Sequence, residues 1–130
     1  MDISMPWTDK LPELYKEFYG ADIYETLPEV FWDLPAHKAS LARYRYHDFI
    51  AELFARSFAD TIGGWCRENN LALTGHMMEE PTLRSQCAAL GEAMRSYRSF
   101  QLPGIDMLCA NYEFTTAKQA QSASHQYGRP

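Results

Sequence analysis

The second half of the chain alternates helix-like and strand-like segments, and this order restricts the fold more than any other feature. From about Ser40 to Asn69, apolar and aromatic residues recur at spacings of mostly three to five, which predicts a long amphipathic helix. Short apolar runs at about 71–76 and 104–109 predict two strands. A helix from about 82 to 102 separates them, and another follows. Such alternation builds parallel sheets, so we expect a helix-rich α/β fold.

The first part of the chain predicts a helical insert over residues 1–38. Two short helices are expected there, over about 8–20 and 22–32. The 130 residues suit one domain, but two strands cannot form a stable parallel sheet that needs cover on both faces. A complete (β/α)₈ barrel takes about 250 residues. We therefore expect residues 1–130 to be a single partial domain of a larger α/β protein, with helix–strand–helix–strand–helix over 39–130.

Composition and charge exclude several classes of partner. The net charge is −5 and no basic stripe is present, which argues against nucleic acid. No apolar run approaches the roughly 18 residues of a membrane span, and the first residues lack the features of a signal peptide. Cys66, Cys87 and Cys109 form no CxxC pair, so we expect buried thiols and no metal site. This usage favours a cytoplasmic location, although a secreted enzyme without its leader would look the same.

Titratable residues follow the first predicted strand. His76 stands at its end, and the adjacent carboxylates Glu79 and Glu80 come next. In α/β enzymes the chemistry lies at this end of the strands. The alternative readings are a structural histidine and a solvated carboxylate pair that stabilises the N-terminus of the next helix.

The second predicted strand carries an acidic residue, Asp106, which is expensive to bury without a partner. It would bind a substrate or a cation, or pair with Arg84, Arg95 or a backbone amide. Asn111 follows this strand and could line the same pocket, or belong to an ordinary loop. Arg84 and Gln86 begin the intervening helix, where they would brace the carboxylates or lie on the surface.

Three tryptophans, Trp7, Trp32 and Trp65, are candidate platforms for a sugar ring. Trp7 lies in a segment that reads as an exposed loop, and it is the better candidate for stacking. Trp65 falls on the apolar stripe of the long helix, so we expect it in the core.

Several short motifs resemble a known family of sugar-cleaving TIM barrels. They are Pro6-Trp7-Thr8-Asp9-Lys10-Leu11-Pro12-Glu13-Leu14, Tyr19-Gly20-Ala21-Asp22-Ile23, Leu27-Pro28, Trp65-Cys66-Arg67-Glu68, Leu73-Thr74-Gly75-His76-Met77, Thr82-Leu83-Arg84-Ser85-Gln86 and Pro103-Gly104-Ile105-Asp106. Together they resemble the α-L-rhamnosidase-like glycoside hydrolases and their β-galactosidase-type relatives. The resemblance covers nearly the whole chain and implies a segment of a (β/α)₈ barrel that hydrolyses O-glycosidic bonds.

The family resemblance also implies roles for particular residues. Such enzymes use two carboxylates, one of which protonates the leaving oxygen while the other acts as base or nucleophile. Glu80 best fits the place of an acidic active-site residue after Gly-His, with Glu79 next. The partner carboxylate would lie on a strand beyond Pro130. Substrate contacts are expected from His76, Asp106, Trp7 and Asn111. Some family members use calcium, but the chain shows no clear oxygen-ligand spacing for it, so we expect no cofactor.

Two other interpretations stay open. The chain could be a non-enzymatic helical interaction module, in which case the strands at 71–74 and 105–109 would not exist. It could also belong to a TIM-barrel lyase or isomerase, although it lacks a glycine-rich phosphate loop. For a partial sheet we expect self-association through the unpaired strand edges.

Overall fold

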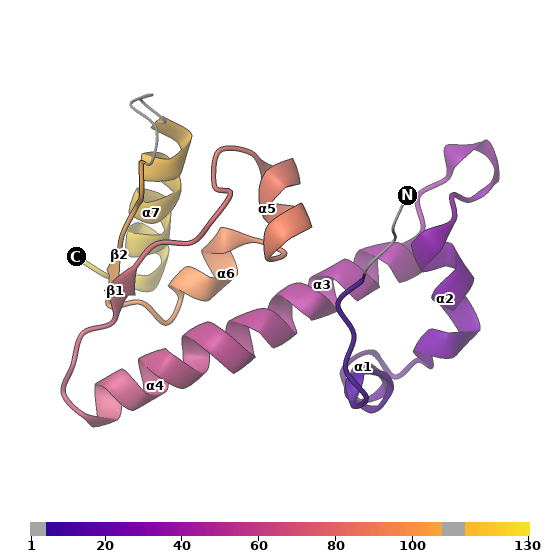
Figure 1. The fold of residues 1–130 in the computed structure, drawn as a ribbon, viewed down its shortest axis with the longest axis horizontal. Helices are drawn as coiled ribbons and strands as arrows, with labels where there is room; N and C mark the ends of the chain where they lie inside the picture. Colours follow the sequence, from indigo (N-terminus) through magenta and orange to yellow (C-terminus); the bar gives the residue numbers. More distant parts are fainter. Residues whose placement is uncertain (1–4, 108–113) are drawn as a thin grey trace. The chain divides into compact units, whose positions relative to one another are not determined.

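A computed structural model describes residues 5–107 and 114–130 of the chain. The structure is 62% helical and contains two parallel strands, as the sequence predicts. The strands of the described residues do not close a barrel. The chain divides into two compact units, Met1–Ile50 and Ala51–Pro130, which are described separately. Figure 1 shows the order of the elements along the chain.

The first unit is helical. Its elements are α1 (Leu11–Tyr19), α2 (Ile23–Phe31), the 3₁₀ turn η1 (Pro35–His37) and the first part of α3 (Leu41–Ala55). Helix α1 ends because Gly20 takes a left-handed conformation (φ 66°), which glycine adopts at little cost. The Asp22 side chain then accepts a hydrogen bond from the Tyr24 amide at 2.9 Å and caps α2. The two predicted short helices are therefore confirmed.

Aromatic side chains form the centre of the first unit. Tyr15 of α1 and Phe49 of α3 are buried, and their rings meet edge to face with centroids 5.5 Å apart. Leu11, Ile23 and Tyr46 are also buried. These residues lie at the helical spacings expected for inward-facing positions, so hydrophobic burial explains the packing of this unit.

The predicted long helix is confirmed as three consecutive helical segments. α3 passes into a π-helical turn, η2 (Arg56–Asp60), and then into α4 (Thr61–Glu68). A π turn contains about one residue more than an α turn, and such turns often occur at functional sites. The sequence pattern did not reveal this turn, because one extra residue barely disturbs an apolar spacing of three to five.

An ion-pair network holds α6 (Ala93–Tyr97) and its C-cap residue Arg98 against this helix. The Arg98 guanidinium binds Glu52 Oε1 at 3.0 Å and Asp60 Oδ2 at 2.6 Å. Hydrogen bonding to Arg98 is the largest influence that lowers the pKa of both carboxyl groups. Because the two acids come from before and within the π turn, Arg98 fastens that turn to α6.

The sheet of the second unit consists of β1 (Thr74–Gly75) and β2 (Leu102–Pro103), which lie side by side in parallel (Figure 1). Both strands are shorter than the predicted ranges 71–76 and 104–109, and the second begins two residues earlier. Residues 104–107 have no strand structure, and 108–109 lie outside the described residues. Pro103 has no N–H to donate, which limits the ladder at this point.

Three helices complete the second unit: α5 (Leu83–Ala89), α6 and α7 (Phe114–Tyr127). The prediction of one helix over 82–102 was wrong. Gly91 interrupts it with a φ of 89°, and a Cβ atom there would lie 2.5 Å from Ala51 Cβ. The buried apolar core of the unit comprises Ala59, Met77, Leu90, Ala93, Tyr97, Phe100 and Ala123.

Several residues predicted to be buried lie on the surface. Trp65 is 58% exposed, and it continues a series with Phe54, Phe58 and Ile62, which are also exposed. We call these four residues the exposed stripe. Cys66 is buried as expected, but Cys87 is exposed because it lies on the outer side of the short helix α5. Within residues 5–107 and 114–130, no helix is long and apolar enough to cross a membrane.

Candidate functional site

The ends of the two parallel strands bring His76 and Asp106 together. His76 directly follows β1, and Asp106 lies three residues beyond β2. The distance from His76 Nε2 to Asp106 Oδ2 is 3.6 Å, and the side chains are 47% and 35% exposed. The sequence suggested Arg84 or Arg95 as the side-chain partner of Asp106, but the structure places His76 beside it. Parallel strands end at the same edge of a sheet, which explains the encounter.

The other ring nitrogen of His76 is fixed by the backbone. Nδ1 lies 2.7 Å from the Met77 carbonyl oxygen. A carbonyl oxygen can only accept a hydrogen bond, so Nδ1 must carry a proton in this arrangement. The Nδ1–H tautomer leaves Nε2 directed toward Asp106.

Glu80 is the buried carboxylate of the site. The residue is 5% exposed, and its Oε1 atom has no hydrogen-bond partner among the described residues. Its main-chain carbonyl, by contrast, accepts hydrogen bonds from Gln86 Nε2 at 2.9 Å and Gln119 Nε2 at 2.7 Å. A buried polar atom without a partner is costly in a folded protein. Such an atom marks Glu80 as a candidate for contact with a ligand.

The neighbouring carboxylate, Glu79, has a different environment. Glu79 is exposed, and its backbone is left-handed with a φ of 59°. Its carbonyl accepts a hydrogen bond from Ser85 Oγ at 2.8 Å, which helps to hold this uncommon conformation. The turn therefore directs Glu79 to solvent and Glu80 to the interior. Of the two candidates, only Glu80 has the protected position that a catalytic carboxyl group needs.

Tyr97 is a site residue that the sequence reading missed. Its side chain is fully buried, and its hydroxyl donates to the Gly104 carbonyl at 3.1 Å and accepts from the Met77 amide at 3.4 Å. It thereby connects the chain after β1 to the chain after β2. Burial raises the pKa of Tyr97, and the nearby charge of Glu80 adds to the rise. The available signal was a tyrosine at an apolar helix position, where the hydroxyl needs a partner.

Two glutamines brace Glu80 from different helices. Gln86 of α5 is buried and also donates to Gln119 Oε1 at 2.8 Å, while its own Oε1 accepts from the Ala93 amide at 3.1 Å. Gln86 was predicted to brace the carboxylates or to lie on the surface, but it is buried and holds the main-chain carbonyl of Glu80; Arg84 is exposed. Gln119 of α7 had not been singled out, because nothing in the sequence brings it near Glu80.

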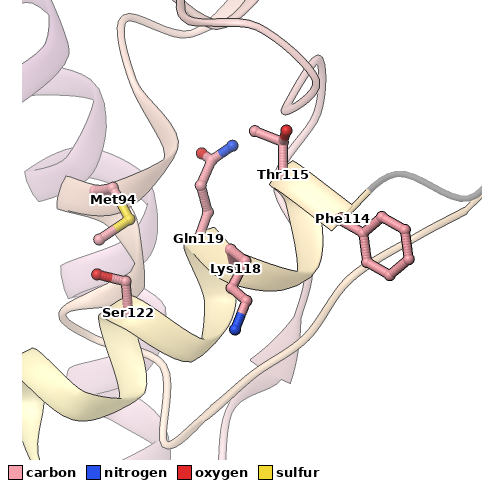
Figure 2. A pocket seen from close by; sticks show the side chains of 6 residues that line it. All are labelled: Met94, Phe114, Thr115, Lys118, Gln119 and Ser122. Carbon is pink, nitrogen blue, oxygen red and sulfur yellow. The ribbon is translucent and has the colours of Figure 1, made fainter.

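An open hollow of about 400 Å³ borders Gln119. Figure 2 shows its six lining side chains, of which Met94 comes from α6 and the others from α7: Met94, Phe114, Thr115, Lys118, Gln119 and Ser122. None of these residues was among the predicted site residues. Gln119 connects the hollow to Glu80, since it is one of the lining residues and its Nε2 atom also donates to the Glu80 carbonyl.

The structure does not test two of the predicted substrate contacts, Trp7 and Asn111. Trp7 is exposed and belongs to the first unit, where its ring lies 6.2 Å from that of Tyr24. Asn111 lies outside the described residues. Across residues 5–107 and 114–130, no group of three or more His, Cys, Asp or Glu side chains is arranged to hold a metal ion.

Comparison with known proteins gives no further guidance, since no family model, no curated protein and no solved structure matches the chain.

Proposed function

We propose that this chain supplies the acid and part of the sugar-binding edge of a glycoside hydrolase that cleaves O-glycosidic bonds. The observation that carries the proposal is Glu80, a buried carboxylate whose Oε1 atom has no partner in the described part of the chain, close after a strand whose end also presents His76. Asp106 from the neighbouring strand reaches the same edge. This arrangement suits an enzyme that binds a sugar ring at the ends of parallel strands and protonates its glycosidic oxygen from a protected carboxyl group.

In this reading β1 and β2 are adjacent strands of a (β/α)₈ barrel. A two-stranded parallel sheet needs further strands and cover on both faces, and a barrel supplies both. Glu80 would protonate the glycosidic oxygen as the bond breaks. A second carboxylate from another strand would activate water or attack the anomeric carbon. His76 and Asp106 would contact hydroxyl groups of the substrate, and no cofactor is required.

The leaving group of the substrate provides the sharpest test. The protein encoded by the complete open reading frame is assayed on alkyl glycosides and on 2,4-dinitrophenyl glycosides, with and without the substitution Glu80→Gln. An alkoxide is a poor leaving group and needs protonation, whereas dinitrophenolate hardly does. Loss of the acid should therefore lower kcat/KM on alkyl glycosides by about 10²–10⁴-fold, and far less on dinitrophenyl glycosides.

Glu79→Gln is the matched control, because it makes the same chemical change at the exposed neighbour. It should leave both rates near the wild-type values. Equal losses for the two substitutions, or equal losses on both substrates, would contradict the assignment of Glu80. A protein that hydrolyses no glycoside in the panel would contradict the proposed function as a whole.

A second candidate function is that of a helical interaction module. The exposed stripe favours it, because four large apolar residues follow one another along one helix at spacings of four, four and three. Apolar helix faces of this kind bind partner helices or grooves. Binding of glycosides at His76 and Asp106 would favour the enzyme, whereas association that depends on the stripe without glycoside binding would favour the module.

A further inference from the structure

We propose that His76 Nε2 and Asp106 Oδ2 form a pair of hydrogen-bond acceptors that recognises two neighbouring hydroxyl groups on a sugar ring. The inference rests on the proposed function and names its substrate class, a glycone with a free vicinal diol. It concerns recognition alone, so it can succeed or fail separately from the catalytic role of Glu80.

The hydrogen bond from His76 to the backbone determines which ring nitrogen carries the proton. The Met77 carbonyl, 2.7 Å from Nδ1, can only accept a hydrogen bond, so Nδ1–H is the donor. In the neutral ring the remaining nitrogen, Nε2, then has a lone pair and acts only as an acceptor. The neutral form of His76 at this position is therefore a donor toward the backbone and an acceptor toward the strand edge.

The two acceptors lie close together but do not bond to each other. Nε2 and Oδ2 are 3.6 Å apart, beyond the usual range of a hydrogen bond. A neutral imidazole and a carboxylate at this distance present two lone pairs side by side, with no proton of their own between them. Each can accept an O–H group at about 2.8 Å. Hydroxyl oxygens on adjacent ring carbons lie close enough together to reach both acceptors at once.

Hydrogen bonds hold the chain segments that carry the two acceptors in a fixed relation. The Gly104 amide donates to the Gly75 carbonyl at 2.8 Å, one residue before His76 on one segment and two residues before Asp106 on the other. The Tyr97 hydroxyl connects Met77 with Gly104. These bonds fix the separation of the two chain segments, while both side chains keep access to solvent. A fixed spacing between accessible acceptors selects ligands by the distance between their hydroxyl groups.

A bound cation explains the pair less well than a diol. Protein sites for zinc or calcium use four to eight ligands. Among the described residues, no third His, Cys, Asp or Glu joins His76 and Asp106. A vicinal diol needs only two acceptors, one for each hydroxyl group, and His76 Nε2 and Asp106 Oδ2 supply them.

The tautomer of His76 is measured directly by long-range ¹H–¹⁵N NMR of the imidazole at about pH 8. The expected spectrum shows a protonated Nδ1 and an unprotonated Nε2. A ring protonated on both nitrogens would mean a simple ion pair with Asp106. A ring protonated on Nε2 alone would mean a histidine that donates to the carboxylate. Either result would overturn the proposal.

Ligand recognition is tested with cyclohexane-1,2-diol, cyclohexane-1,3-diol and methyl glycosides lacking single hydroxyl groups, followed by shifts of the His76 ring signals. The 1,2-diol should bind and the 1,3-diol should not. Removal of either hydroxyl of one adjacent pair should weaken glycoside binding about tenfold. Asp106→Asn should weaken it similarly, and Glu79→Gln should not.

Equal binding of the two diols, or shifts caused only by added Zn²⁺, would overturn the diol assignment. Diol binding without hydrolysis by the full-length protein would leave the acceptor pair intact and refute the proposed function. Hydrolysis without dependence on a vicinal diol would do the reverse.

Discussion

Gly63 lies directly against the main-chain carbonyl of Ser99: a Cβ atom at Gly63 would stand 2.6 Å from that oxygen. Real Cβ atoms do not approach oxygens so closely, so the backbone after α6 can approach α4 only because residue 63 has no side chain. Gly63 thereby permits a close approach of two backbone segments.

Gly63→Ala should destabilise the protein, because α4 and the Ser99 segment must move apart. Forcing extra volume into a packed site typically costs about 1–3 kcal/mol. Gly64→Ala is the matched control, since its nearest neighbour is the end of the Arg67 side chain at 3.8 Å. That change should stabilise the helix by roughly 0.5–1 kcal/mol. Urea denaturation of both variants measures the difference, and equal effects would show that the close approach is absent in solution.

Asp60→Asn should reduce stability near neutral pH, because it removes a charge that Arg98 and Ser99 bind. We expect a loss of about 2 kcal/mol, below the 3–5 kcal/mol of a fully buried pair because Arg98 and Asp60 are about a third exposed. Asp33→Asn is the matched control. Asp33 also has a lowered pKa beside an arginine, but it is highly exposed, so no measurable loss is expected.

The same ion pair predicts a dependence on pH. The pKa of Asp60 is lower in the folded protein than in the unfolded chain, where it is about 3.9. Its contribution is thus present above about pH 4 and is lost as the pH falls through the lower, folded value. The stability difference between wild type and Asp60→Asn should therefore shrink in acid. A difference that stays constant between pH 7 and pH 2 would exclude this explanation.

Glu80→Met should stabilise the protein while abolishing its proposed activity. The substitution replaces a buried carboxyl group that has an unpaired oxygen by an apolar side chain of similar length. Removing an unsatisfied buried polar atom gains about 1 kcal/mol. Glu79→Met at the exposed neighbour should leave the free energy of unfolding nearly unchanged. A loss of stability in Glu80→Met would mean that the carboxylate has a structural partner instead of a functional one.

Phe58→Glu should prevent the expected self-association if the exposed stripe is the contact surface. A charge in the middle of four apolar side chains opposes their burial against a second copy. Ser57→Glu adds the same charge at an adjacent exposed residue outside the stripe. Sedimentation velocity over a range of concentrations compares the two variants. Association that survives in Phe58→Glu would point to the edges of β1 and β2 instead.

The sequence predicted the elements of this protein better than their ends. Helical spacing found the long helix, and Gly20 and Asp22 correctly marked a helix end and a helix start, because these signals are local. The interruption at Gly91 depends on the approach of Ala51, forty residues away. Trp65 was assigned to the core because an apolar stripe normally faces one, yet it is exposed. Local sequence patterns do not determine which apolar face of a helix becomes buried by other elements.

The candidate site was predictable to a similar degree. The meeting of His76 and Asp106 follows from the rule that parallel strands end at one edge, and it required only that the strands pair. The difference between Glu79 and Glu80 depends on one left-handed residue, which no pattern indicated. Tyr97 and Gln119 were missed because their roles lie in hydrogen bonds to main-chain atoms, which leave no trace in side-chain spacing.

The π turn makes the number of residues between Glu52 and Asp60 as important to the ion-pair network as the two carboxylates themselves. In a regular α-helix, Glu52 and Asp60 would point about 80° apart around the axis, but one surplus residue brings them within about 20°. Arg98 can reach both carboxylates for that reason. Exchanges of one side chain for another inside the turn leave this alignment in place. Deletion of a single residue from this turn would rotate the helix that follows by about 100° relative to Glu52, so the alignment of the two carboxylates would be lost even though both side chains were still present.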